Sequence, residues 1–366
     1  MKMHKLALYT REFSNIFAMP LSFYIGYPLL RPTVFAFYLT RRCNSRCRMC
    51  DFWRSQTKDD LSFDQVTAIL DDLKAFGVKT ISFSAEGEMF TREDAIDILQ
   101  YAKKLGFVFG INSNGLAIDR QLAERIAGVA PNSIVFSIDS TNPTQYAYIR
   151  GVKDGLQRVM SAVSNLQEAG YNKVSGGAVI RDDNLDEVPK LLAFARRLGL
   201  HGFRFTAMQR HGFSKVWTDE QWGKLAEPGF QQELQQVLGE LRASVKSDDL
   251  LANSEPYLSM IPPYFKADHF YPIPCIEGYY KGKIMPNGDL SLCPIMGKTA
   301  VIGNLSDEPL SVLWYGKKAQ EVRKIIRRGK CPGCWLSCYG EDNLRFAPRY
   351  ALAANFNALR RALKLV

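Results

Sequence analysis

Three cysteines lie within eight consecutive positions, in the stretch RRCNSRCRMCDFW, as Cys43, Cys47 and Cys50. An odd number of thiols this close together favours metal ligation over disulfide bonds, because one thiol would stay unpaired. Three thiolates on one loop can hold three irons of a [4Fe–4S] cluster and leave the fourth iron for a small-molecule ligand. Zinc and coincidence are the alternatives, and zinc would need a fourth ligand that no histidine nearby in the sequence supplies.

A second set of cysteines lies beyond residue 270, at the positions Cys275, Cys293, Cys331, Cys334 and Cys338. Such clustering in a long chain indicates metal binding rather than a disulfide framework, and therefore a reducing compartment such as the cytoplasm. Two pairs of cysteines can also form a tetrahedral structural zinc site, so zinc stays open for this set.

The segments that must position the first cysteines alternate between β-rich runs and amphipathic helical stretches. Six runs are predicted as strands, at residues 34–40, 79–87, 108–115, 133–139, 173–180 and 202–208. Such alternation predicts a parallel sheet with helices outside it. Six units are fewer than the eight of a closed barrel, so we expect an α/β fold with a partial (β/α)6 TIM-like barrel. A doubly wound open sheet is the alternative.

Either architecture places the active site at the carboxyl ends of the strands. Residues that could bind a cofactor or take part in a reaction follow four successive strands there: Cys43, then Glu86 to Glu88, then Asn114, then Asp139. Between the first two strands, residues 63–76 have helical spacing, with Ser62 as N-cap and Gly77 as the stop.

The chain divides into five expected parts. Residues 1–33 form an apolar and basic extension, 34–225 the barrel, and 226–269 a linker. Residues 270–345 form a small cysteine-rich domain with a β-hairpin at Asn287-Gly288 and a helix. Residues 346–366 form an amphipathic helix whose apolar stripe is Leu352, Phe356, Leu359, Leu363 and Val366.

The net charge of +10 is concentrated near the C-terminus, where Lys317 to Lys330 contains seven basic residues and only Glu321 as an acid. Such a run suits nucleic acid, anionic lipid or a phosphorylated substrate, or is simply a solvated helix face. The N-terminal stretch NIFAMPLSFYIGYPLL is too short, and too broken by Pro20 and Pro28, to span a bilayer. It fits a helix in the membrane interface, or one that packs on the protein.

Cys-x3-Cys-x2-Cys after the first strand of a β/α domain resembles the radical S-adenosylmethionine (SAM) superfamily. The resemblance implies that SAM binds the open iron of a [4Fe–4S] cluster held by Cys43, Cys47 and Cys50. It also implies reductive cleavage of SAM to methionine and a 5′-deoxyadenosyl radical, which abstracts a hydrogen atom from the substrate. An external electron donor such as flavodoxin or ferredoxin follows from the same resemblance, as does a position of Met49 near the adenine.

Three further segments resemble SAM-binding motifs of that superfamily. EGEMFTRED resembles Gly-Gly-Glu-Pro, with Gly87 and Glu88 matching and with Glu86 and Met89 as departures, and it implies that Glu88 meets the SAM amino group. NSNG resembles the Thr-Asn-Gly turn and implicates Asn114. SIDSTNPTQYAYIRG resembles a Ser-Leu-Asp-Gly segment with its Ile-Arg-Gly, and implicates the residues Ser137, Asp139 and Arg150.

The C-terminal cysteines resemble the auxiliary-cluster extension called SPASM, or twitch in its reduced form. Five cysteines suffice for one fully ligated cluster, expected to be [4Fe–4S], and the spacing of Cys275, Cys293, Cys331 and Cys334 matches twitch best. Cys338 is then a replacement ligand, a free thiol or a residue with another role. The two resemblances cover residues 34–208 and 270–340.

These resemblances predict a radical SAM oxidoreductase-type enzyme whose auxiliary cluster accepts an electron, giving net oxidation or bond formation on a small-molecule or lipid-linked substrate. The alternative is a maturase of a ribosomal peptide, with a partner to bind any leader. The non-enzyme alternative, a zinc-stabilised nucleic-acid-binding protein, is disfavoured because the basic run lacks interleaved aromatic residues. The sequence does not choose a catalytic acid or base among the candidates Glu86, Arg181, Gln209, Arg210 and Tyr339.

Overall fold

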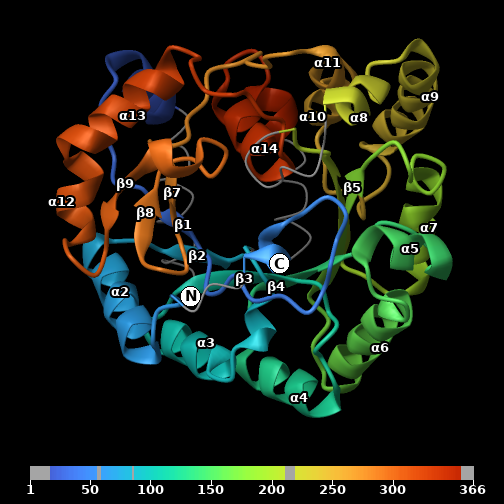
Figure 1. Cartoon of the computed structure of the whole chain (residues 1–366), viewed down its shortest axis with the longest axis horizontal. Coiled ribbons are helices and arrows are strands. Elements are labelled where there is room, and N and C mark those ends of the chain that lie inside the picture. Colours follow the sequence, from blue (N-terminus) through green and yellow to red (C-terminus); the bar gives the residue numbers. More distant parts are fainter. Residues whose placement is uncertain (1–16, 56–58, 85, 211–218, 356–366) are drawn as a thin grey trace.

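The computed structural model of the chain describes residues 17–55, 59–84, 86–210 and 219–355. In this part the strands form one nine-stranded sheet in the order β6-β5-β4-β3-β2-β1-β7-β8-β9 (Figure 1). The strands are β1 (Val34–Phe37), β2 (Thr80–Phe83), β3 (Val108–Ser113), β4 (Ser133–Ser137), β5 (Val174–Ile180), β6 (Gly202–Ala207), β7 (Lys281–Ile284), β8 (Asp289–Ser291) and β9 (Val301–Asn304).

Strands β1 to β6 are parallel, and each pairs with its neighbour in sequence. The helices lie outside the curved sheet, so Figure 1 shows helices around an open arc of strands. This confirms the predicted partial barrel. The α-helices along this part of the chain are α2 (Phe63–Phe76), α3 (Ala95–Lys104), α4 (Arg120–Val129), α5 (Pro143–Arg150), α6 (Gly155–Glu168) and α7 (Val188–Arg197), with short 3-10 turns η1 (Phe52–Arg54) and η2 (Met89–Thr91).

Local sequence signals set the helix ends. Helix α2 begins with a capping box, in which the Ser62 side chain accepts from the Gln65 backbone N–H and the Gln65 side chain accepts from the Ser62 N–H. It ends at Gly77 in the left-handed region (φ 99°), which glycine adopts without strain. Both ends of this helix are as predicted.

The two faces of the barrel strands differ in side-chain size. Residues facing the helices are large and fully buried, for example Phe37, Phe83 and Phe136. The alternate residues are partly exposed or exposed and mostly small: Ala36, Ser82, Gly110, Asn112, Ser133, Val135, Ser175, Gly177 and Thr206. A closed TIM barrel fills its interior with branched apolar side chains, whereas this barrel leaves its inner face accessible.

The cysteine-rich region continues the barrel sheet. Strand β7 pairs in parallel with β1, with Val34 opposite Lys281, so it covers the edge that β1 would otherwise expose. Strands β7 and β8 form the predicted antiparallel hairpin, and Gly288 occupies the turn with φ 86°. Strand β9, the 3-10 turn η3 (Gly297–Ala300) and the helices α12 (Leu310–Tyr315), α13 (Lys317–Arg327) and α14 (Ser337–Phe346) complete the region.

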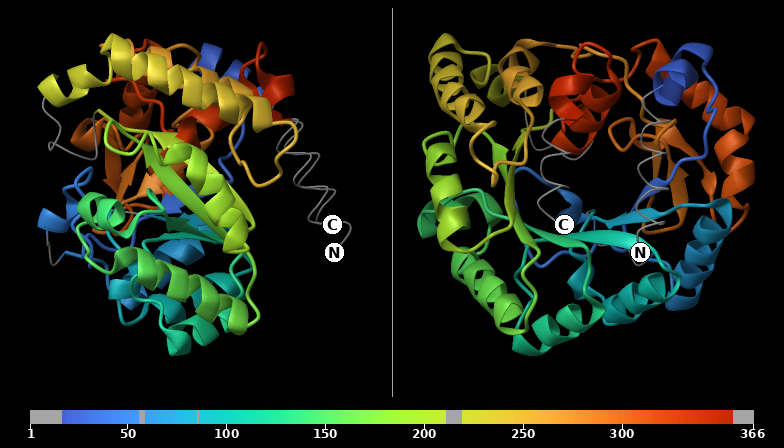
Figure 2. Two further views of the ribbon diagram at one scale, coloured as in Figure 1. Left: turned by 90° about the vertical axis from the view of Figure 1, so that its right-hand side faces the viewer. Right: turned by 180° about the vertical axis from the view of Figure 1, so that it is seen from behind.

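The stretch expected as a linker is largely helical. It contains α9 (Pro228–Ser244), α10 (Glu255–Ser259) and α11 (Ile261–Lys266), and α8 (Asp219–Lys224) precedes it. Helix α9 packs against α10 and α11 (Figure 2), and Leu234, Tyr257 and Phe265 are fully buried there. These helices extend the wall of helices past β6.

Both terminal predictions fall partly on undescribed residues. Residues 1–16 of the N-terminal extension lie outside the described part, and residues 17–25 are helical. Of the C-terminal stripe, Leu352 is exposed, while Phe356, Leu359, Leu363 and Val366 lie outside the described residues. Among the described residues, no helix combines the length and apolar character needed to cross a membrane.

Candidate active site

The loop that carries Cys43, Cys47 and Cys50 follows β1 and rests on the end of α5. The backbone N–H of Arg46 donates to the Arg150 carbonyl (3.2 Å), and that of Arg48 donates to the Ile149 carbonyl (2.9 Å). Gly151 ends α5 in the left-handed region, and a Cβ there would lie 2.5 Å from the Arg46 carbonyl oxygen. The glycine of Ile-Arg-Gly is therefore needed for the close approach of the loop, a role the sequence reasoning missed.

Glu88 is buried at the end of β2, with its carboxylate aimed at the next strand end. One carboxylate oxygen accepts from the Ser113 hydroxyl (2.9 Å), and the other accepts from the Asn114 backbone N–H (2.7 Å). Burial raises the pKa of Glu88 to about 7, although these hydrogen bonds act to lower it. The carboxylate is thus fixed in position by its neighbours and sensitive to a cationic partner.

Gly87 lets the Glu88 segment pack directly on the cysteine loop. A Cβ at this position would lie 2.3 Å from the Arg42 carbonyl oxygen, and the Glu88 backbone N–H donates to that same oxygen (2.8 Å). Glu86, which departs from the motif, pairs with Arg41 at 2.8 Å. The departure at Glu86 is therefore accommodated by an ion pair, while the glycine that the packing requires is present.

Asn114 and Ser137 lie at the ends of β3 and β4. The Asn114 side-chain amide donates to the Asn44 side-chain oxygen (2.7 Å), which links the third strand end to the cysteine loop. Its N–H group also lies 3.9 Å from the Cys43 sulfur. The Ser137 carbonyl accepts from the Tyr146 hydroxyl (3.0 Å), which leaves the Ser137 side chain on the inner face.

Asp139 and Arg150 form a buried ion pair beneath the loop. The second Asp139 carboxylate oxygen accepts from the Val179 backbone N–H (2.7 Å), so both oxygens are engaged. The Arg150 guanidinium also approaches the Cys47 sulfur (3.6 Å). Asp139 is fully buried and does not line a pocket with the other residues, so it positions Arg150.

One pocket of about 150 Å³ brings the strand ends and the loop together. It is lined by the three cysteines Cys43, Cys47 and Cys50 and by six of the seven residues expected to contact SAM, namely Met49, Gly87, Glu88, Asn114, Ser137 and Arg150. Burial raises the pKa of Cys43 to about 11 and that of Cys50 to about 12, so these free thiols need a metal to become thiolates at neutral pH. We propose these residues as the site of the SAM-binding cluster and of SAM.

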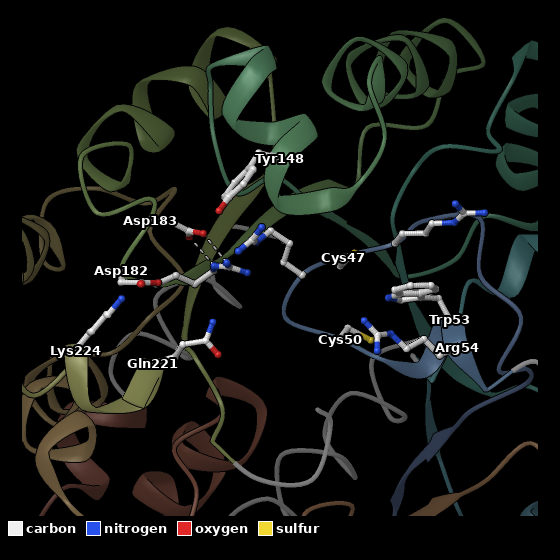
Figure 3. Close-up of a pocket in the computed structure, with 12 residues that line it drawn as sticks. Cys47, Cys50, Trp53, Arg54, Tyr148, Asp182, Asp183, Gln221 and Lys224 are labelled. Atoms are coloured by element: carbon white, nitrogen blue, oxygen red, sulfur yellow. Dashed lines mark hydrogen bonds and ion pairs between the residues drawn. The ribbon is translucent and has the colours of Figure 1, made fainter. Parts of the chain in front are cut away.

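A second, larger pocket of about 450 Å³ lies on the other side of the same loop (Figure 3). It shares Cys47, Cys50 and Trp53 with the first pocket. Its cations outnumber its acids: Arg46, Arg48, Arg54, Arg181 and Lys224 stand against Asp182 and Asp183. Arg181 is occupied by a bidentate contact with Asp183, at 2.6 and 2.7 Å.

The exposed arginines of this rim stack on aromatic rings. The Arg54 guanidinium lies 4.9 Å from the centre of the Trp53 ring, and Arg48 lies 4.0 Å from the Tyr148 ring. Within the described part of the chain, Arg46, Arg48 and Arg54 have no carboxylate within 4.0 Å. The rim therefore keeps its positive charge.

The C-terminal cysteines come together from separate elements. Cys275 precedes β7, Cys293 follows β8, and Cys331 and Cys334 follow α13. Burial raises the pKa of Cys275 first, and the neighbouring Glu277, Cys293 and Cys331 raise it further. Burial raises the pKa of Cys334 in the same way, with Cys293 and Cys275 as its next contributors. Cys275 thus has Cys293, Cys331 and Cys334 as electrostatic neighbours.

Cys338 lies on a different element. It is in the first turn of α14 and is exposed, and the charged groups that act most strongly on it are Lys281, Glu277, Arg204 and Asp342. We propose Cys275, Cys293, Cys331 and Cys334 as the ligands of the auxiliary cluster and Cys338 as a free thiol.

Buried charges lie directly beside the auxiliary cysteines. Lys283 is fully buried and pairs with Glu277, and Lys281 pairs with Asp342 at 2.6 Å. The ammonium groups of Lys281 and Lys283 lie 4.6 and 4.5 Å from the centre of the Tyr339 ring. The auxiliary site thus lies in an electrostatically compensated interior.

The two kinds of metal site that the sequence leaves open need different spacings of the thiols. A tetrahedral zinc ion needs four ligands around one centre, whereas each thiolate of a cubane binds a different iron and so lies farther from the others. Among the described residues, no three Cys, His, Asp or Glu side chains gather closely enough to hold one metal ion.

The residues considered as acid or base are largely occupied by other contacts. Arg210 pairs with Asp219 (3.1 Å) and Asp268 (3.4 Å), while Gln209 and Tyr339 are buried. Of the five candidates, Glu86 alone lines the pocket beside the three cysteines, and it is paired with Arg41. The described geometry assigns a general base to none of them.

Two protein-family models match the chain. The Radical SAM superfamily model matches residues 37–195, which contain the first cysteine loop and the strands β2 to β5. The model of the SPASM iron-sulfur cluster-binding domain matches residues 275–339, which contain all five C-terminal cysteines.

Curated relatives match different lengths of the chain. The Fe-coproporphyrin III synthase of Methanosarcina barkeri is 32% identical over 158 residues, which are 42% of this chain and 38% of that protein. The chain thus spans well under half of this relative. The PqqA peptide cyclase of Rhizobium meliloti is 23% identical over 302 residues, which are 80% of this chain and 76% of that protein.

Among solved structures, Streptococcus suis SuiB bound to its precursor peptide SuiA has the same fold. The TM-score is 0.65 at 18% identity, and the match covers 84% of this chain and 70% of SuiB.

Proposed function

The chain belongs to the radical SAM superfamily and carries a C-terminal SPASM iron–sulfur cluster-binding domain, and on this premise we propose that it modifies a peptide. The cofactors of this radical SAM enzyme are SAM, the SAM-binding cluster and an auxiliary cluster. A peptide is better supported than the small-molecule or lipid-linked substrate predicted from the sequence.

The extent of the matches supports a peptide. The match to the peptide cyclase runs through 80% of this chain, whereas that to the porphyrin-processing enzyme covers 42%. SuiB, which shares the fold, was solved with a precursor peptide bound. The simplest inference from this contrast is that the chain shares its substrate class with the relative that matches both domains.

The observation that carries the proposal is the accessible inner face of the barrel. Mostly small side chains line it from β1 to β6, with the exposed Arg204 as a large exception, and a pocket of about 280 Å³ lies among Ser133, Val135, Ser175 and Arg204 at the amino ends of the strands. The strand ends that hold Ser137 and Val179 border the SAM pocket. An extended chain with a narrow backbone suits such a lumen, which has room that a packed barrel lacks.

The residues of the chain have separable roles in this reaction. Glu88 and Asn114 would orient SAM, with Glu88 accepting hydrogen bonds from its amino group, and Arg150 and Asp139 would hold the cysteine loop. When bound, the clusters supply the electron that cleaves SAM to methionine and a 5′-deoxyadenosyl radical, and an acceptor for the electron of the substrate radical. The walls of the barrel exclude water and competing reactants.

The basic rim in Figure 3 supports an acidic one-electron donor such as flavodoxin or ferredoxin. Its arginines flank Cys47 and Cys50 in sequence, so a protein bound there would lie against the loop that holds the cluster. Charge complementarity would speed the encounter of the two proteins. The reduced thiols require a reducing compartment, for which we propose the cytoplasm.

Deuterium transfer tests the substrate class. Cells that natively express the protein are grown in deuterated medium, and their extract is separated into peptide, small-metabolite and lipid fractions. Each fraction is incubated anaerobically with the reconstituted enzyme, SAM and dithionite. We expect deuterated 5′-deoxyadenosine with the peptide fraction, because the radical takes its hydrogen from the substrate. Deuterium from only the small-metabolite or lipid fraction would overturn the proposal.

A further inference from the structure

The helix at residues 17–25 presents one apolar face to the protein and another to solvent. Met19 and Phe23 are 1% and 5% exposed, and Phe23 packs edge-on against the Tyr279 ring. Phe17, Leu21 and Tyr24 are 67%, 51% and 68% exposed. Their spacing of four and three residues puts them on one stripe of the helix.

The exposed apolar surface continues beyond the helix. Ile25, Tyr27 and Leu29 are 54%, 46% and 46% exposed. Six of the eleven large hydrophobic side chains that are exposed in the described part of the chain therefore lie within residues 17–29. We call these six the apolar patch: Phe17, Leu21, Tyr24, Ile25, Tyr27 and Leu29. Contiguous patches of this kind mark interaction surfaces.

A basic helix lies beside the apolar patch. The Arg327 guanidinium of α13 donates to the Tyr24 carbonyl (2.9 Å), and Tyr27 stacks on Tyr315 of α12 with ring centres 5.8 Å apart. In Figure 1 the blue N-terminal helix accordingly lies next to α13. These contacts fix the patch and α13 as one continuous surface.

The exposed side of α13 is strongly positive. Ala319, Val322 and Ile326 are buried, which turns the charged positions outward. The exposed cations are Lys317, Lys318, Lys324, Arg328 and Lys330, and Glu321 is the acid among them. None of these five cations forms a salt bridge with another described residue.

We propose that the apolar patch and the basic side of α13 bind the surface of an anionic phospholipid bilayer. The aromatic and aliphatic side chains would enter the headgroup region while the lysines and arginines face anionic lipid headgroups, the arrangement of interfacial amphipathic helices. The inference is independent of the peptide substrate, because neither surface lines the SAM pocket.

A bilayer fits this surface better than a macromolecular partner. None of the three pockets described above contains a residue of the patch. A bilayer needs no shape complementarity. Single-stranded nucleic acid would need aromatic rings set among the cations, whereas here they form a separate strip.

The test is flotation of the full-length reconstituted protein with phosphatidylcholine vesicles, with and without phosphatidylglycerol. We expect binding to the anionic vesicles that salt weakens. Leu21→Ser with Tyr24→Ser should reduce the bound fraction by about tenfold through lost apolar contact. Lys317→Glu with Lys318→Glu and Lys324→Glu should remove the preference for anionic vesicles.

Matched controls replace exposed residues of the same types elsewhere. Phe63→Ser with Leu352→Ser, and Lys103→Glu with Lys104→Glu and Arg125→Glu, should bind vesicles like the parent protein. Equal iron content and circular dichroism verify that each variant folds. Absence of vesicle binding by the parent protein overturns the proposal, as does binding that neither variant changes. If the parent protein does not bind vesicles, two results would identify another partner and overturn the proposal. One is a mobility shift of an oligonucleotide that the basic variant abolishes. The other is a dimer that the apolar variant converts to a monomer.

Discussion

The two cysteine regions differ in the residues and pockets that surround them. Cys43, Cys47 and Cys50 come from one short loop, flanked by exposed arginines and bordered by pockets on two sides. The auxiliary cysteines are drawn from widely separated parts of the C-terminal region, beside the fully buried Lys283 and its partner Glu277. Each set contains one buried cysteine, Cys47 or Cys293, so the regions differ in their surroundings: the first borders two pockets, and the second lies beside buried, paired charges.

The difference shows how one chain can keep two redox sites distinct. A site that must admit SAM and receive an electron benefits from exposed charge. It also benefits from a cysteine loop that residues of other segments hold in place. A site that only exchanges electrons with the substrate benefits from burial and compensated charge, which restrict solvent and set its potential. The variants below test this division.

The largest effect is expected from removing the ligands of one site at a time. Cys43→Ala with Cys47→Ala and Cys50→Ala should lower the iron content from about eight to about four per chain and abolish 5′-deoxyadenosine formation. Cys275→Ala with Cys293→Ala should lower the iron equally but leave dithionite-driven SAM cleavage in place. Iron and sulfide analysis with product chromatography measures both. SAM cleavage that survives the first variant contradicts the assignment of the loop.

Breaking the buried ion pair of Lys283 and Glu277 should destabilise the protein, because the charges beside the auxiliary cysteines are buried and paired. Lys283→Met leaves Glu277 without its closest cation, and a broken buried pair costs roughly 3–5 kcal/mol of stability. Glu277→Leu in the same chain should restore most of that loss, because no charge then stays unpaired. Anaerobic urea denaturation of the reconstituted protein measures the free energy of unfolding of each variant. Arg41→Met serves as the open-site control, and an equal loss there would contradict the distinction.

Glu88→Gln should weaken SAM binding while leaving the iron content unchanged. The amide keeps the shape of the side chain but loses the charge that strengthens its hydrogen bonds to a cationic amine, a loss of about 1.5–3 kcal/mol or roughly 10- to 150-fold in affinity. Equilibrium dialysis with labelled SAM measures the change. Glu86→Gln is the control, since Glu86 is engaged by Arg41. Equal weakening by both variants would remove the special role of Glu88.

Reversing the charge of the rim should slow reduction by a protein donor without affecting a chemical one. Arg54→Glu with Lys224→Glu is expected to lower flavodoxin-dependent SAM cleavage by about tenfold at low salt, because steering is electrostatic. The dithionite-driven rate and the iron content should not change. Lys104→Glu with Arg125→Glu, on the outer helices, is the matched control. A loss with both reductants would mean that the loop itself is damaged.

The smallest effect is expected at Cys338. Cys338→Ser should leave the auxiliary iron content and its electron paramagnetic resonance spectrum unchanged, because Cys338 is the thiol that we propose as free. Cys334→Ser, a change of the same atom four residues away, should reduce or alter the auxiliary signal. If Cys338→Ser changed the auxiliary signal and Cys334→Ser did not, Cys338 would be a ligand of the cluster.

Much of the site could be predicted from the sequence because its signals are local. The spacing of Cys43, Cys47 and Cys50 depends on one loop, the capping box at Ser62 depends on four residues, and the alternation of strands and helices determines a parallel barrel. Glu88 and Asn114 were found because parallel strands end at one edge of the sheet.

Other features exist only through contacts between distant segments. That β7 would extend the barrel sheet beside β1, that Gly151 would make room for Arg46, and that Asp139 would be fully buried under Arg150 depend on approaches that no spacing encodes. The position of Cys338 in the first turn of α14, on a different element from the other thiols, likewise comes from the fold, and burial is a property of packing, not of residue order.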